Sequence, residues 1–163
     1  MNLKKKTAIA GVLVVFSAIS FVANAVTLRI ANQGDALSLD PHSLNESLQL
    51  TVLNNIYEPL VARDRNYKLV PALATDWKQT SPTVWRFNLR KNVQFHDGTP
   101  FTADDVIFNY ERAKDAGSDM KSYVGQIKEI KKIDDHTVDF VLNNPFPILP
   151  ELFTGWMQMS KKW

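Results

Sequence analysis

Three pairs of short segments, each joined by a few polar turn residues, constrain the fold of this chain most. In the clearest pair, 75–79 and 84–90, the residues Trp85, Phe87 and Leu89 alternate with polar ones. This period of two is typical of a half-buried strand in an antiparallel sheet. A short polar turn between two such segments predicts a β-hairpin. The other two predicted hairpins are 60–63 with 68–70 and 127–133 with 137–142.

Helices are predicted between these hairpins, without the regular alternation of parallel βαβ units. One helix is expected to start near Asn45 or Ser47. A second should follow Thr102, which has the Thr-x-x-Asp spacing of a capping box with Asp105. Residues 26–31 alternate and predict a first strand. The predicted fold class is therefore α+β, with a mixed, mostly antiparallel sheet and packed helices.

The first 25 residues have the pattern of a secretion signal. Residues 4–6 are lysines, residues 8–22 are apolar, and Ala-Asn-Ala at 23–25 has the small-x-small form of a cleavage site. The apolar run is shorter than the ~20 residues that cross a bilayer comfortably, so we expect cleavage over membrane anchoring. The expected organisation is a signal peptide at 1–25 and one exported domain at 26–163.

The composition excludes several classes of protein. The chain has no cysteine, which removes disulfide scaffolds, thiolate metal sites and cysteine nucleophiles. Without the three leader lysines, the 19 basic residues fall to 16, against 17 acidic ones. The one basic cluster, 128–132, is expected on the solvent side of an edge strand. No nucleic-acid partner is therefore expected.

No residues have the spacing of a catalytic or metal site. His42, His96 and His136 are separated by 54 and 40 residues, and each is expected as an exposed histidine in a turn. Ser118 and Lys121 have the Ser-x-x-Lys spacing of penicillin-recognising enzymes, but the Lys-Thr-Gly and Ser-Asp-Asn partners are missing from the sequence. We expect no cofactor, no metal and no enzymatic activity.

An ordered series of motifs resembles a known family. Asp-Pro-His at 40–42 is followed by Tyr-Glu-Pro-Leu at 57–60 and Pro-Ala-Leu-Ala-x-x-Trp at 71–77. The longest motif, at 85–106, includes Val-x-Phe-His-Asp-Gly-x-Pro-x-Thr-Ala-x-Asp-Val. From about residue 26 onward the chain resembles the N-terminal part of the periplasmic peptide-binding proteins of ABC importers. This extracellular solute-binding family includes oligopeptide, dipeptide, nickel and haem receptors.

The resemblance implies a fold of two lobes around a cleft that closes on its ligand. Members are several times longer, so we expect a truncated form with part of one lobe, ending soon after a helix opens at Glu151. The implied function is to capture short peptides in the periplasm, as a monomer, for permease subunits in the inner membrane. Nickel-chelate, haem or oligosaccharide ligands stay open within the family. Outside it, the alternatives are a secreted hydrolase and a fragment without function.

The resemblance also implies where the ligand binds. The loop after Asp-Pro-His approaches the ligand in relatives, and it corresponds here to Asn45, Glu46 and Ser47. Tyr123 is a second candidate. These positions vary among ligand classes, so the location is predicted without the chemistry. Asn45 and Ser47 could instead cap the helix that they precede.

Overall fold

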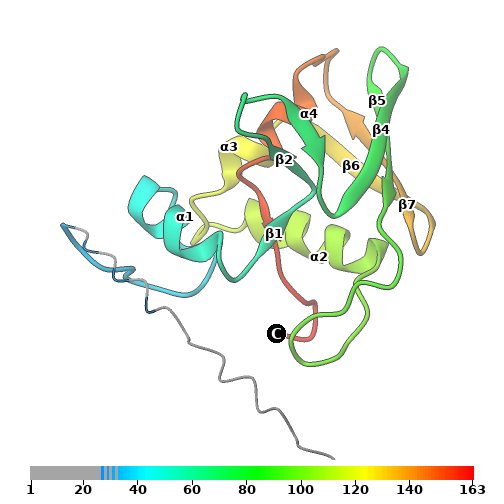
Figure 1. Ribbon diagram of the computed structural model, residues 1–163. Helices are drawn as coiled ribbons and strands as arrows, with labels where there is room; N and C mark the ends of the chain where they lie inside the picture. The colour runs from blue at the N-terminus through cyan, green and yellow to red at the C-terminus, as the bar shows by residue number, and fades with distance from the viewer. Residues whose placement is uncertain (1–26, 28, 30, 32) are drawn as a thin grey trace, which may run out of the picture. The chain divides into compact units, whose positions relative to one another are not determined.

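The computed structural model describes residues 27, 29, 31 and 33–163 (Figure 1). The predicted signal peptide lies outside the described residues. Of the predicted strand at 26–31, residues 27, 29 and 31 are described, and none of these three is in a strand. The chain divides into two units after Ala31, and the account below concerns the unit Asn32–Trp163. Within the described part of the chain, no helix combines the length and apolar character that a membrane crossing requires.

A four-stranded antiparallel sheet is the largest element of the fold. Its strand order is β4-β5-β7-β6, so two of the predicted hairpins are confirmed and join side by side through β5 and β7. Trp85 lies opposite Phe140, and Phe87 lies opposite Val138. Phe87, Val138 and Phe140 are fully buried, as their alternation predicts. The strands are β4 (Ala74–Ser81), β5 (Val84–Leu89), β6 (Ile127–Asp134) and β7 (Thr137–Leu142).

Two smaller antiparallel pairs complete the described strands. β2 (Val61–Arg63) and β3 (Leu69–Pro71) form the third predicted hairpin, which is also confirmed. β1 (Glu58–Pro59) pairs with β8 (Met157–Gln158), a contact that no sequence pattern predicts. This second pairing returns the C-terminal segment to the part of the chain that follows the first helix.

The helices confirm the α+β class and correct one prediction. In the second helix, α2, the carboxylate of Asp105 accepts hydrogen bonds from the backbone N–H and the hydroxyl of Thr102, at 2.9 and 3.1 Å. The helix predicted to open at Glu151 is wrong in extent, because a single turn ends at Leu152 and the chain then enters β8. The helices are α1 (Ser47–Leu53), α2 (Ala103–Lys114), α3 (Lys121–Val124) and α4 (Leu149–Leu152).

Aromatic side chains from the sheet and from the C-terminal segment form the centre of the core. The ring centroids of Phe140 and Phe153 are 4.7 Å apart, and those of Phe153 and Trp156 are 5.2 Å apart. Tyr110 of α2 packs over the same sheet and donates its hydroxyl to the backbone carbonyl of Ile127, at 3.0 Å. Phe153 and Trp156 follow the single turn of α4 and are fully buried. They complete the core that the sheet forms with α2.

Candidate functional site

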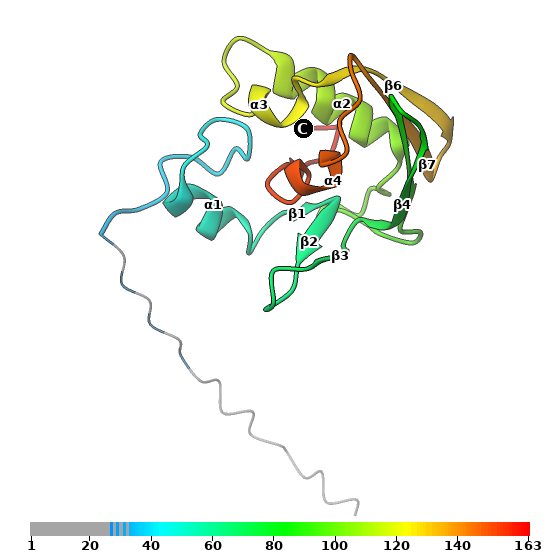
Figure 2. The same cartoon turned by 90° about the horizontal axis from the view of Figure 1, so that it is seen from above.

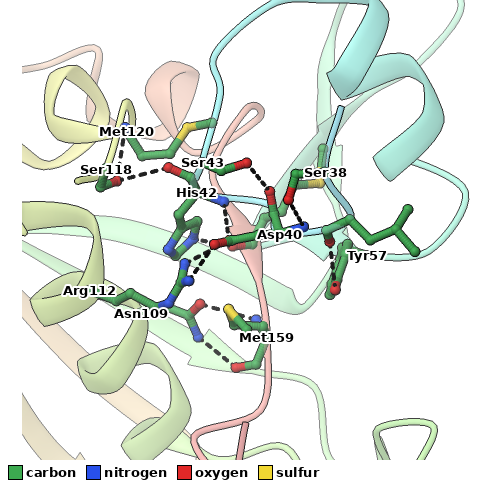
Figure 3. A network of polar contacts seen from close by, with 12 residues as sticks. Ser38, Asp40, His42, Ser43, Tyr57, Asn109, Arg112, Ser118, Met120 and Met159 are labelled. Carbon is green, nitrogen blue, oxygen red and sulfur yellow. Dashed lines mark hydrogen bonds and ion pairs between the residues drawn. The ribbon is translucent and has the colours of Figure 1, made fainter. Parts of the chain in front are cut away.

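The Asp-Pro-His turn is fixed to α2 by an ion pair (Figure 3). The guanidinium of Arg112 donates two hydrogen bonds to the carboxylate of Asp40, at 2.8 and 2.5 Å. The backbone N–H of His42 donates a third, at 2.9 Å. Partial burial alone would raise the pKa of Asp40, but these hydrogen bonds outweigh it and the pKa is lowered. The turn is thus held in place directly before the predicted ligand loop.

His42 is buried, and its prediction as an exposed turn histidine is wrong. Only 1% of it is exposed, and its Nε2 lies 3.0 Å from the carbonyl oxygen of Met157 on β8. The hydroxyl of Ser118 donates to the His42 carbonyl at 3.2 Å. Burial lowers the pKa of His42, and the charge of Arg112 lowers it further. Spacing along the chain could not reveal this burial, because Met157 is 115 residues away.

The remaining histidines and the Ser-x-x-Lys motif form no reactive centre. His96 is exposed and His136 is half-buried. In the part of the chain that the structure describes, no group of His, Asp or Glu side chains is arranged to hold a metal ion. Ser118 accepts from the backbone N–H of Met120 at 3.1 Å, and the ammonium of Lys121 donates to the carbonyl of Ala116. Both side chains therefore bond to backbone groups, Ser118 to that of His42 as well, and the two are not paired with each other.

The residues predicted to contact the ligand come together in the structure. Asn45, Glu46 and Ser47 are exposed, and Ser47 is the first residue of α1. Tyr123 lies on α3, and the loop that leads into α1 runs on the same side of the fold as α3 (Figures 1 and 2). The Tyr123 hydroxyl donates to the side-chain oxygen of Asn45 at 3.2 Å, across 78 residues of sequence. The capping alternative is not observed: Glu46 precedes the helix, and no side chain caps it.

The backbone of this loop is available for pairing. Glu46 is extended, with φ −127° and ψ 152°. Among the described residues, no hydrogen bond uses the backbone N–H of Asn45 or Glu46, or the carbonyl of Asn45. Extended, exposed backbone without partners can add a strand-like ligand through main-chain hydrogen bonds. The arrangement suits binding of an extended molecule that carries amide groups.

Sequence reasoning missed the side chain that fixes the C-terminal segment to α2. Asn109 of α2 is fully buried. Its amide oxygen accepts from the backbone N–H of Met159 at 3.1 Å, and its amide nitrogen donates to the Met159 carbonyl at 2.8 Å (Figure 3). An asparagine among the buried positions of an amphipathic helix is a signal that could have indicated such a role.

Comparison with known proteins identifies the class. Residues 68–162 match the family model described as "Bacterial extracellular solute-binding proteins, family 5 Middle". The chain belongs to this family, which confirms the resemblance drawn from the motifs. It is a family of binding proteins rather than enzymes.

Named relatives agree with this assignment. The chain is 30% identical over 150 residues to the periplasmic oligopeptide-binding protein OppA of Escherichia coli (strain K12), covering 80% of this chain and 28% of OppA. It is 35% identical over 112 residues to the glutathione-binding protein GsiB of Pectobacterium atrosepticum, covering 67% of this chain and 22% of GsiB. The chain thus spans less than a third of the length of these curated relatives.

Solved structures show the same fold. The structure of Haemophilus influenzae OppA in complex with RPPGFSPFR matches with a TM-score of 0.73 and 27% identity, over 78% of this chain and 29% of that one. Burkholderia pseudomallei OppA matches with a TM-score of 0.72 and 26% identity, over 77% and 28%. The described chain therefore has the fold of part of a solute-binding protein, as predicted.

Proposed function

We propose that this chain supplies one wall of the peptide site in the substrate-binding component of an ABC importer. The component would capture short peptides in the periplasm and deliver them to permease subunits in the inner membrane. Membership of the family supports the binding role, and the signal pattern at 1–25 supports the compartment. The printed names of relatives support the ligand class: oligopeptide-binding OppA, and Helicobacter pylori DppA in complex with the peptide STSA.

The observation that carries the proposal is the exposed backbone of Asn45 and Glu46 beside Tyr123, which is extended at Glu46 and has N–H groups without partners among the described residues. A peptide presents a regular series of N–H and C=O groups, whatever its side chains are. Main-chain pairing with the loop would hold such ligands with little dependence on their sequence. The Asn45 oxygen already accepts from Tyr123, which orients the amide so that its N–H groups remain to donate to a peptide carbonyl.

Glu46 adds a charge to this wall. Its carboxylate is exposed next to the pairing backbone, where it would attract the N-terminal ammonium of a peptide. The attraction should weaken as salt is added, because the charges are open to solvent. A peptide with a free N-terminus is therefore preferred over one with an acetylated N-terminus.

Binding by this chain should be weak, because the wall is open to solvent. Each exposed hydrogen bond contributes about 0.5–1.5 kcal/mol net. Association costs an estimated 4–15 kcal/mol in lost freedom of movement, so a few such bonds give millimolar affinity at best.

Titration of the ¹⁵N-labelled chain with trialanine, followed by NMR, tests the proposal. We expect saturable shifts centred on Asn45, Glu46 and Ser47. Tyr123→Phe removes one hydrogen bond that orients Asn45, so it should raise the Kd roughly 2- to 10-fold. Tyr67→Phe is the matched control, since that tyrosine is 79% exposed on the β2–β3 hairpin and should leave the Kd unchanged.

Two results would contradict the proposal. Trialanine shifts that are absent, or that map away from 45–47, would remove the site. Shifts at 45–47 with a nickel–histidine complex and none with trialanine would replace peptides by a metal chelate as the ligand class.

A further inference from the structure

Gly155 lies directly against the ring of Tyr123. It follows α4 and precedes β8. A Cβ atom built on Gly155 would lie 2.6 Å from both Cε1 and the hydroxyl oxygen of Tyr123, and 2.8 Å from Cζ. Real Cβ atoms essentially never approach another atom closer than 3.0 Å. The far end of the Tyr123 ring therefore occupies the space that any other side chain at position 155 would need.

Glycine is needed here for space and not for its backbone conformation. Among the described glycines, only Gly98 has a positive φ, at 80°. Gly155 thus has no positive φ to oppose an alanine, and the three atoms nearest to an added Cβ all belong to the Tyr123 side chain. Gly117 is the useful contrast, since a Cβ there would meet nothing within 4 Å.

Tyr123 is consequently held on two sides. The Gly155 backbone supports the ring, and Asn45 accepts the hydroxyl at 3.2 Å. Moving from 2.6 Å to ordinary contact at 3.4 Å requires a displacement of about 0.8 Å. The atoms that a Cβ at position 155 would meet are at the free end of the half-buried Tyr123 side chain. The Tyr123 ring would therefore move before the backbone at position 155 does. A displacement of this size is enough to break a hydrogen bond of this length.

We propose that Gly155 is a positioning residue, which sets the place of Tyr123 in the ligand wall by leaving room for its ring. The proposed function enters this inference only in naming the wall as the peptide site. A methyl group at position 155 would displace the Tyr123 hydroxyl from the place where it meets Asn45, and the side-chain amide that Asn45 offers a peptide would lose its fixed orientation. The size of residue 155 thereby determines how well this wall fits its ligand.

The first test needs no ligand. In the chain with ¹³C-labelled tyrosine rings, nuclear Overhauser effects should connect the Tyr123 ring to the side-chain amide of Asn45 and to the α-protons of Gly155. Gly155→Ala should shift the Tyr123 ring signals and abolish the contact with Asn45. Gly117→Ala, the matched control, should leave both unchanged. Unchanged Tyr123 signals and contacts in Gly155→Ala would overturn the inference.

A second variant covers the case in which Gly155→Ala fails to fold. Adding Tyr123→Ala removes the ring and should restore folding, which supports a conflict between the methyl group and the ring. If the double variant also fails to fold, the backbone at position 155 is responsible and the inference is overturned.

Ligand binding separates a positioning role from a purely structural one. In the trialanine titration, Gly155→Ala should raise the Kd by about the same factor as Tyr123→Phe, and Gly117→Ala should not. Failure of the ring measurement counts against Gly155 alone. Failure of trialanine to bind at 45–47 in the unaltered chain counts against the proposed function alone.

Discussion

Replacement of Asn109 by alanine should destabilise the fold severely. The buried Asn109 amide accepts from the Met159 N–H and donates to the carbonyls of Met159 and Asp105, at 3.1, 2.8 and 2.7 Å. Alanine leaves both backbone groups of Met159 without a partner, and Met159 is only 2% exposed. Each buried group without a partner costs about 1–3 kcal/mol, so the expected loss is about 2–6 kcal/mol. That is a large share of the 5–15 kcal/mol that typically stabilises a domain.

Urea unfolding followed by tryptophan fluorescence measures this loss. Asn143→Ala is the matched control, because Asn143 is exposed and its change should stay within about 0.5 kcal/mol. Asn109→Asp keeps an acceptor for the Met159 N–H but loses both donors, so it should also destabilise. A loss for Asn109→Ala no larger than that of the control would refute the anchoring of the C-terminal segment by α2.

Three further predictions concern packing, pH and export. Phe87→Ala should lower the free energy of unfolding, measured with urea, by about 3–5 kcal/mol. Arg86→Ala should lower it by less, although this change removes the ion pair of Arg86 with Asp139 on β7. Burial lowers the pKa of His42, so below about pH 6.5 the unfolded chain binds a proton at His42 more readily than the folded chain does. The free energy of unfolding should therefore fall as the pH drops below about 6.5, by at most about 1.4 kcal/mol per pH unit. His42→Gln should flatten this part of the stability–pH curve, while the lowered pKa of Asp40 adds a further loss only below about pH 3.8. The intact mass of the exported product should correspond to a chain that starts at Val26, and a product retaining the leader in the membrane fraction would contradict this.

The hairpins could be predicted from the sequence because their signals are local. The alternation of Trp85, Phe87 and Leu89 gives the buried face, and a short polar turn gives the pairing partner. The capping box of α2 is local as well, since Thr102 and Asp105 are three residues apart. Each of these features depends on neighbours within a few residues, and the structure has all of them.

The contacts that assemble the site are not local, and the sequence alone did not reveal them. The polar face of β5 gave no indication that Arg86 pairs with Asp139 of β7. The turn at 40–42 predicts an exposed His42, and the sequence gives no sign of its partner on β8, because Met157 is 115 residues away. The location of the candidate site follows from the resemblance, and its geometry requires the structure, which joins Tyr123 to Asn45.

Amide hydrogen exchange at Asn45 and Glu46, with and without trialanine, tests the central claim most directly. These two N–H groups have no partner among the described residues and lie on exposed backbone, so they should exchange rapidly in the free chain. If a peptide pairs with this backbone, saturating trialanine should slow exchange at both positions and leave the exposed β2–β3 hairpin unaffected. Unchanged exchange at both positions, with protection elsewhere, would contradict the account.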